Sequence, residues 1–254
     1  MAGMSLLAAL AILGVGLAAG TLNTIVGSGS LITFPTLLVL GYPPVVANVS
    51  NTVGLVTGSI SGAIGYRREL EGQRRRLRML GVASLAGGLT GGLLLLALPA
   101  SVFRNVVPVL ILISCALVAF QPRLARRVAS REGPAWVHGG PLLFAAVFVT
   151  GVYGGYFGAA QGVMLIALLG IFLDDSLQRL NAAKNVLAAL VNGIAALLFI
   201  VFADVDWAVA GLLAAGAIVG GQVGASVGRR ISPQWLRAVI VIVGVAVAIR
   251  LLVR

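Results

Sequence analysis

Long apolar stretches separated by short polar segments run along the whole chain. The apolar runs fall at residues 5–26, 30–41, 45–66, 77–98, 101–121, 139–160, 162–173, 180–203, 207–228 and 235–253. A transmembrane helix needs about 20 consecutive apolar residues, and most of these runs reach that length. The pattern therefore predicts an all-α, polytopic membrane protein with about 7–8 transmembrane segments.

Two of the runs, 30–41 and 162–173, are too short to cross a bilayer. Each follows a glycine-rich break, Gly27 to Ser30 in the first case and Gly158 to Gly162 in the second. Irregular backbone at membrane depth is tolerated where it is buried in protein or lines a cavity. We therefore expect each short run to be the second limb of a broken or re-entrant helix.

Breaks at corresponding places indicate a duplication. An ungapped shift of 133 residues pairs Gly29 with Gly162 and Asn48 with Asn181, and it superposes the Gly-Gly-x-x-Gly of 87–91 on that of 220–224. This register predicts two homologous repeats, each with a broken or re-entrant first helix. The predicted boundaries are residues 1–122 for the first membrane repeat, 123–137 for a basic inter-repeat loop and 138–254 for the second membrane repeat.

Composition supports the membrane assignment, because 59% of the residues are hydrophobic and only 10% are charged. The net charge of +11 comes from arginines that cluster at 67–78, 123–131 and 229–237. The positive-inside tendency places such clusters in the cytoplasm, so we read them as topology signals and predict no nucleic-acid partner.

The sequence is compatible with two arrangements of the repeats. All three clusters share one side if each broken segment returns to its starting side, which makes the repeats inverted. Arg250 and Arg254 then end on the opposite side. If the broken segments cross once, the repeats are parallel and the C-terminus is cytoplasmic.

Polar residues inside the apolar runs gather at the two breaks and just after them. A polar side chain in a bilayer is costly unless it has partners or water, so this grouping predicts one shared polar cavity. The short helices after the breaks present free N–H groups and a positive dipole end, which favour an anion. The predicted substrate-binding residues are Asn23, Ser28, Gly29, Ser30, Asn48, Asn51, Gln161, Gly162, Asn181, Lys184 and Asn185, with further backbone donors up to Val163.

Lys184 is the chain's single lysine and has amide rather than acidic neighbours. It is free to attract an anion, or, alternatively, it snorkels to the lipid headgroups. No Asp or Glu lies within an apolar run, so we expect neither a carboxylate proton relay nor an acid/base pair for an enzyme. The chain has one cysteine, Cys115, and one histidine, His138, which are too few ligands for a Cys/His metal site, and we predict no cofactor.

Several motifs resemble the sulfite exporter TauE/SafE family of membrane permeases. In the first half they are Phe34-Pro35, the Gly-Tyr-Pro-Pro turn of 41–44, Ala47 to Asn51 and Tyr66-Arg67-Arg68; in the second half they are Gly151 to Gly162, Asn181 to Asn185 and Asp204 to Trp207.

The resemblance implies a multi-pass permease in the bacterial cytoplasmic (inner) membrane that exports sulfite, sulfonates or sulfonated organic acids. Its partners would be a small anionic substrate and membrane lipids, and self-association into a homo-oligomer is left open. The alternatives are a permease for another small anion or a neutral solute, an intramembrane enzyme, and a non-transporting membrane scaffold.

Overall fold

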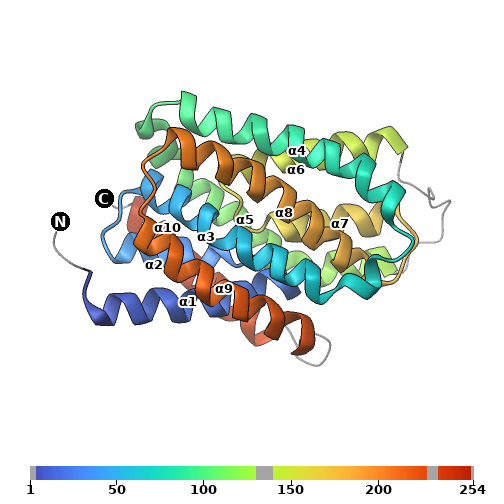
Figure 1. Cartoon of the computed structure of the whole chain (residues 1–254), viewed down its shortest axis with the longest axis horizontal. Coiled ribbons are helices and arrows are strands. Elements are labelled where there is room, and N and C mark those ends of the chain that lie inside the picture. Colours follow the sequence, from blue (N-terminus) through green and yellow to red (C-terminus); the bar gives the residue numbers. More distant parts are fainter. Residues whose placement is uncertain (1–3, 130–139, 228–233, 253–254) are drawn as a thin grey trace.

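A computed structural model describes residues 4–129, 140–227 and 234–252. Within these residues the chain forms helices only (Figure 1), which confirms the predicted all-α class. The elements are α1 (Leu6–Ile25), α2 (Ser30–Val39), α3 (Pro44–Gly65), the 3-10 helix η1 (Arg67–Leu70), α4 (Arg74–Ala97), α5 (Ala100–Ala129), α6 (Gly140–Tyr156), α7 (Gln161–Phe172), α8 (Leu177–Phe202), α9 (Trp207–Val227) and α10 (Gln234–Leu252).

The helices have the length and composition of a polytopic membrane protein. Among the described residues, 5 helices are long and apolar enough to cross a bilayer, namely α1, α4, α8, α9 and the Ala100–Phe120 part of α5. The helices α2, α6 and α7 are apolar but shorter. Apolar side chains such as Val201 and Phe202 are exposed on the outside of the bundle, as expected for a protein surrounded by lipid.

The first helix of each half is re-entrant. The helix α2 folds back along α1, because Gly29 lies against the carbonyl oxygen of Ala19 and the Tyr42 hydroxyl lies 3.9 Å from the Met4 sulfur. In the second half α7 packs against α6, and Asp175, just after α7, pairs with Arg76 near the start of α4, which runs parallel to α6. Each pair is therefore a hairpin that returns to the side on which it began.

The two halves run in opposite directions. The helices α1 and α9 run in parallel, since Gly16 contacts Leu213 while Gly20 contacts Ala217. The helices α4 and α6 also run in parallel and in the opposite sense to α1 and α9. The counterparts α1 and α6 therefore point opposite ways, so the repeats are inverted rather than parallel.

Glycines allow these parallel pairs to approach closely. A Cβ atom on Gly91 of α4 would lie 2.0 Å from the carbonyl oxygen of Val152, and one on Gly220 of α9 would lie 2.1 Å from that of Leu17. No side chain fits at such distances, which is the packing mode of small residues between membrane helices. The predicted Gly-Gly-x-x-Gly segments are thus scaffold.

The inverted arrangement brings basic segments to one end of the bundle. The last residue of α3, Gly65, contacts Ala225 near the end of α9, and the Arg67–Leu70 turn follows directly. The helices α4 and α8 begin at this end, which we call the basic end, at the right of Figure 1. The helix α5 continues to Ala129, through the first part of the predicted 123–137 loop; the rest of that loop, with His138 and Arg254, lies outside the described residues.

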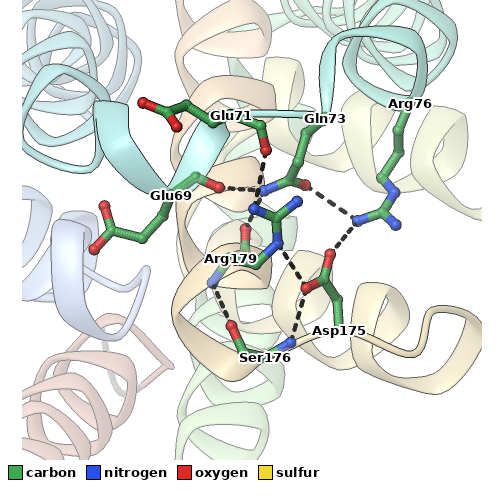
Figure 2. Close-up of polar contacts among 7 residues, drawn as sticks. All are labelled: Glu69, Glu71, Gln73, Arg76, Asp175, Ser176 and Arg179. Carbon is green, nitrogen blue, oxygen red and sulfur yellow. Dashed lines mark hydrogen bonds and ion pairs between the residues drawn. The ribbon is translucent and has the colours of Figure 1, made fainter.

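A polar cluster joins the two halves at the basic end (Figure 2). Asp175, in the turn between α7 and α8, accepts from Arg76 at 2.9 Å and from Arg179 at 2.7 Å. The amide nitrogen of Gln73 donates to the Arg179 carbonyl at 3.0 Å, and Arg179 donates to the Glu71 carbonyl at 2.9 Å. This Asp175 cluster clamps the start of α4 to the start of α8.

Candidate substrate site between the two breaks

The two breaks touch each other inside the bundle. Gly27 has φ +84°, and a Cβ atom there would lie 2.4 Å from the Cα of Gly162. The N–H of Gly162 donates to the Gly27 carbonyl at 3.1 Å. Only glycine combines that φ with so close an approach, and the breaks of both halves therefore form one junction.

Two hydroxyl groups that were not predicted from the sequence donate hydrogen bonds to the backbone of the second break. The carbonyl oxygen of Ala159 accepts from Tyr153 at 2.6 Å and from Ser114 at 3.1 Å. A serine within an apolar run and a tyrosine five residues before Gly158 were the available signals. The backbone then turns through Ala160, whose φ of 58° is left-handed, into α7.

Lys184 caps the end of α1 at the first break. Its side chain is 1% exposed, and its ammonium donates to the carbonyl oxygens of Asn23 at 3.0 Å and Thr24 at 3.1 Å. Those carbonyls end a helix, where the dipole is negative and a cation is favoured. This geometry is inconsistent with the snorkelling alternative, because the ammonium lies inside the protein.

Two amides assist Lys184 on the same helix end. Asn181 donates to the Thr24 carbonyl at 3.1 Å and Asn185 donates to it at 3.4 Å. An ammonium has three N–H donors, so two of those of Lys184 are occupied by carbonyls and one has no acceptor among the described residues. The side chain of Asn23, on the last turn of α1, donates to Ser59 at 3.0 Å.

The first half repeats this capping with neutral residues. Asn48, the counterpart of Asn181, donates to the carbonyl oxygen of Tyr156 at 3.1 Å, at the end of α6. Asn51 stands at the position that corresponds to Lys184, where it accepts from Thr33 and donates to the Ser30 hydroxyl at 3.3 Å. The junction thus has a charged side at the first break and a neutral side at the second.

The predicted backbone donors differ between the breaks. The N–H groups of Gln161, Gly162 and Val163 all donate to backbone carbonyls, those of Gly158, Gly27 and Ala160. The N–H groups of Ser28, Gly29 and Ser30 have no acceptor in the described part of the chain. Free donors at a helix start are thus available at the first break, whereas those of Gln161 to Val163 are occupied.

Several buried side-chain atoms next to the junction lack a hydrogen-bond partner among the described residues. They are Thr24 Oγ1, Ser28 Oγ, Asn48 Oδ1, Gln161 Nε2 and Asn181 Oδ1. An unsatisfied buried polar group costs about 1–3 kcal/mol. Such groups at both breaks indicate a place for water or a polar ligand.

Hydroxyls and an amide N–H can donate to an oxyanion, and the two asparagine oxygens can accept from a protonated one. No group of three or more His, Cys, Asp or Glu side chains that could hold a metal occurs in the ranges the structure describes. The arrangement therefore suits reversible binding of a polar solute.

An all-α multi-pass bundle whose inverted halves meet at two broken helices has the architecture of a secondary transporter. A family model described as "Sulfite exporter TauE/SafE" matches residues 12–251. The chain belongs to the TauE/SafE family, as the sequence motifs indicated, and is a multi-pass membrane transporter.

Relatives of similar length carry transporter names. The chain is 28% identical over 242 residues to the "Probable membrane transporter protein YfcA" of Escherichia coli strain K12, covering 94% of this chain and 87% of the relative. It is 26% identical over 228 residues to a "Probable membrane transporter protein" of Haemophilus influenzae, covering 90% and 88% of the two chains. No solved structure matches the chain.

Proposed function

We propose that the protein exports a small sulfur-containing oxyanion, such as sulfite or a sulfonate, across the bacterial cytoplasmic membrane. The proposed binding site is the junction of the two breaks. The observation that carries the proposal is the buried ammonium of Lys184, which has carbonyl partners and no carboxylate within the described residues.

Charge balance supports an anionic substrate. A buried cation without a counter-ion is expensive, and the carbonyl dipoles of Asn23 and Thr24 offset its charge only in part. An anion that reaches the free N–H groups of Ser28 to Ser30 would complete the neutralisation. A metal cation or a protonated amine would be repelled by the same ammonium.

The position of Lys184 supports export. It lies about two turns from the start of α8, and α8 starts at the basic end, which the positive-inside tendency places in the cytoplasm. An anion leaving the cytoplasm would thus meet the charged side of the junction first. An inside-negative potential favours anion exit by ~2.3 kcal/mol per charge per 100 mV.

A second candidate is a zwitterionic or neutral solute, favoured by the unpartnered oxygens of Asn48 and Asn181. Both oxygens are acceptors and would repel a fully deprotonated anion. An aminosulfonate such as taurine would give them an ammonium while its sulfonate faces Lys184.

Liposomes with the reconstituted protein would separate these candidates. Flux of sulfite, sulfoacetate, taurine and chloride would be compared under an imposed potential, with no pH or sodium gradient. We expect sulfite or sulfoacetate flux that follows the potential. Taurine flux that is indifferent to the potential would favour the second candidate, and equal flux of all four would contradict a selective site.

A further inference from the structure

A groove on the outside of the bundle lies between α4 and α8, close to the basic end and away from the junction. Its volume is about 460 Å³, within the range of ligand pockets. Its lining includes Arg74, Leu77, Arg78, Gly81, Leu85 and Leu190. All but Leu190 lie on α4. The lining thus combines two arginines with apolar residues, which we call the apolar floor.

The two arginines are available to a ligand. Both side chains are exposed, and neither takes part in an ion pair or hydrogen bond within the described residues. Arg76, between them in sequence, instead pairs with Asp175 at 2.9 Å. Residues four apart on a helix lie on one face, so Arg74 and Arg78 present two charges side by side along the groove.

We propose that this groove binds one anionic phospholipid, with its phosphate on Arg74 and Arg78 and an acyl chain along the apolar floor. The groove begins at the first turns of a membrane-spanning helix, where headgroup and acyl chain meet. Charge and apolar surface occur there in the order in which a lipid presents phosphate and hydrocarbon. A free inorganic anion would leave the floor, from Leu77 to Leu85, unfilled.

The matching face of the other half lacks this chemistry. The register of 133 places Trp207 at the position of Arg74 and Gly211 at that of Arg78. The corresponding helix, α9, starts at the opposite end of the bundle. The proposed lipid site is therefore specific to the basic end, where the inner leaflet of a bacterial membrane supplies anionic lipid.

Native mass spectrometry of the full-length protein in detergent would test this site. Phosphatidylglycerol and phosphatidylcholine would be added separately to the wild-type protein and to the double variant Arg74→Gln/Arg78→Gln. We expect the wild type to retain phosphatidylglycerol more tightly than phosphatidylcholine. The double variant should lose about tenfold in phosphatidylglycerol affinity, because each cation near an anionic headgroup contributes several-fold.

The double variant Arg68→Gln/Arg75→Gln is the matched control. It removes the same charge from the same end of the bundle, and both side chains are exposed and do not line the groove. The control should keep the wild-type lipid affinity. An equal loss of phosphatidylglycerol affinity in the control would show that general surface charge causes the effect, and it would contradict the proposed site.

Gly81→Leu tests the apolar floor while leaving both arginines in place. A Cβ atom there would meet only the Leu190 side chain, at 3.1 Å, so the new side chain should occupy the groove and weaken phosphatidylglycerol retention. Full displacement of the lipid by inorganic phosphate would show that the groove binds anions without using its apolar floor, which would contradict the proposal. Unchanged retention in Gly81→Leu, or equal retention of the two lipids, would also contradict the proposal.

Discussion

The two breaks lie at corresponding places in the two halves but differ in their chemistry. At the first break the end of α1 is capped by one ammonium and two amides, from Lys184, Asn181 and Asn185. At the second break the end of α6 is capped by the neutral amide of Asn48, and hydroxyls hold the following turn. Inverted repeats place corresponding residues at opposite depths, so a charge in one half alone makes the junction electrically one-sided.

That one-sidedness gives a scaffold of two similar halves an asymmetric distribution of charge. The scaffold depends on glycines and small residues present in both halves, whereas the electrostatics depend on one residue. Changes to Lys184 should therefore alter ligand binding more than folding, and changes to the junction glycines should alter both.

The largest effect is expected from Lys184→Ala. Removing the ammonium leaves the Asn23 carbonyl without its donor and the junction without its cation. Because hydrogen bonds to charged groups contribute about 1.5–3 kcal/mol, anion affinity should fall about 10- to 100-fold. Lys184→Arg should retain part of the affinity. Isothermal titration with sulfite measures both variants, and wild-type affinity in Lys184→Ala would remove this residue from the site.

A second large effect is expected from Gly27→Ala. The new methyl group would overlap the Cα of Gly162, forcing the breaks apart, and the φ of +84° would be strained. We expect loss of flux and a destabilisation of about 1–3 kcal/mol, measured by thermal unfolding. Gly41→Ala is the matched control, because Gly41 has φ +92° but nothing within 4 Å. Equal losses of stability and flux in the two variants would show that backbone strain alone, and not the contact with Gly162, causes the effect.

Equivalent asparagines should differ in their effect on stability. The Thr24 carbonyl accepts from Lys184 and Asn185 as well as Asn181, so Asn181→Ala should cost less than about 1 kcal/mol. The Tyr156 carbonyl has Asn48 as its donor among the described residues, so Asn48→Ala should cost about 1–3 kcal/mol. Thermal unfolding of both variants measures the difference, and a larger cost for Asn181→Ala would reverse the comparison.

The smallest effect is expected at the Asp175 cluster. Partial burial raises the pKa of Asp175, but hydrogen bonds from Arg76 and Ser176 and the charge of Arg179 outweigh it and hold the pKa below its usual value. A lowered folded pKa stabilises the protein above the unfolded pKa of about 3.9. This stabilisation should fade as the pH falls through the folded value. Asp175→Asn should abolish the part of the acid dependence of the unfolding temperature that comes from Asp175. An unchanged dependence of the unfolding temperature on pH would contradict this role of Asp175.

Much of the fold follows from the sequence because polar groups are costly in a bilayer. The breaks were predicted at Gly27 to Ser30 and Gly158 to Gly162, and α2 and α7 do begin there, at Ser30 and Gln161. The apolar run of 101–121 does not mark the end of α5, which continues to Ala129, because arginines end an apolar run without ending a helix. The backbone hydrogen bonds of a helix form equally well whether the side chains are apolar or charged.

The partners of the site residues could not be predicted. Lys184 binds carbonyl oxygens 160 and 161 residues away in the chain, and a backbone carbonyl has no sequence signature. The binding role of the predicted residues stays a prediction, as do the repeat boundaries. The inverted arrangement was established from the direction in which α1 packs on α9, and the hydropathy pattern carries no information on that direction.

The most direct test of the central claim is the position of a bound oxyanion in the full-length protein. Selenite has the shape and charge of sulfite, and selenium gives an anomalous signal that locates it. We predict one selenium peak at the junction, within hydrogen-bond reach of Ser28 and close to Lys184, that is lost in Lys184→Ala crystals. A peak elsewhere in the bundle, or one that persists unchanged in Lys184→Ala, would contradict the account.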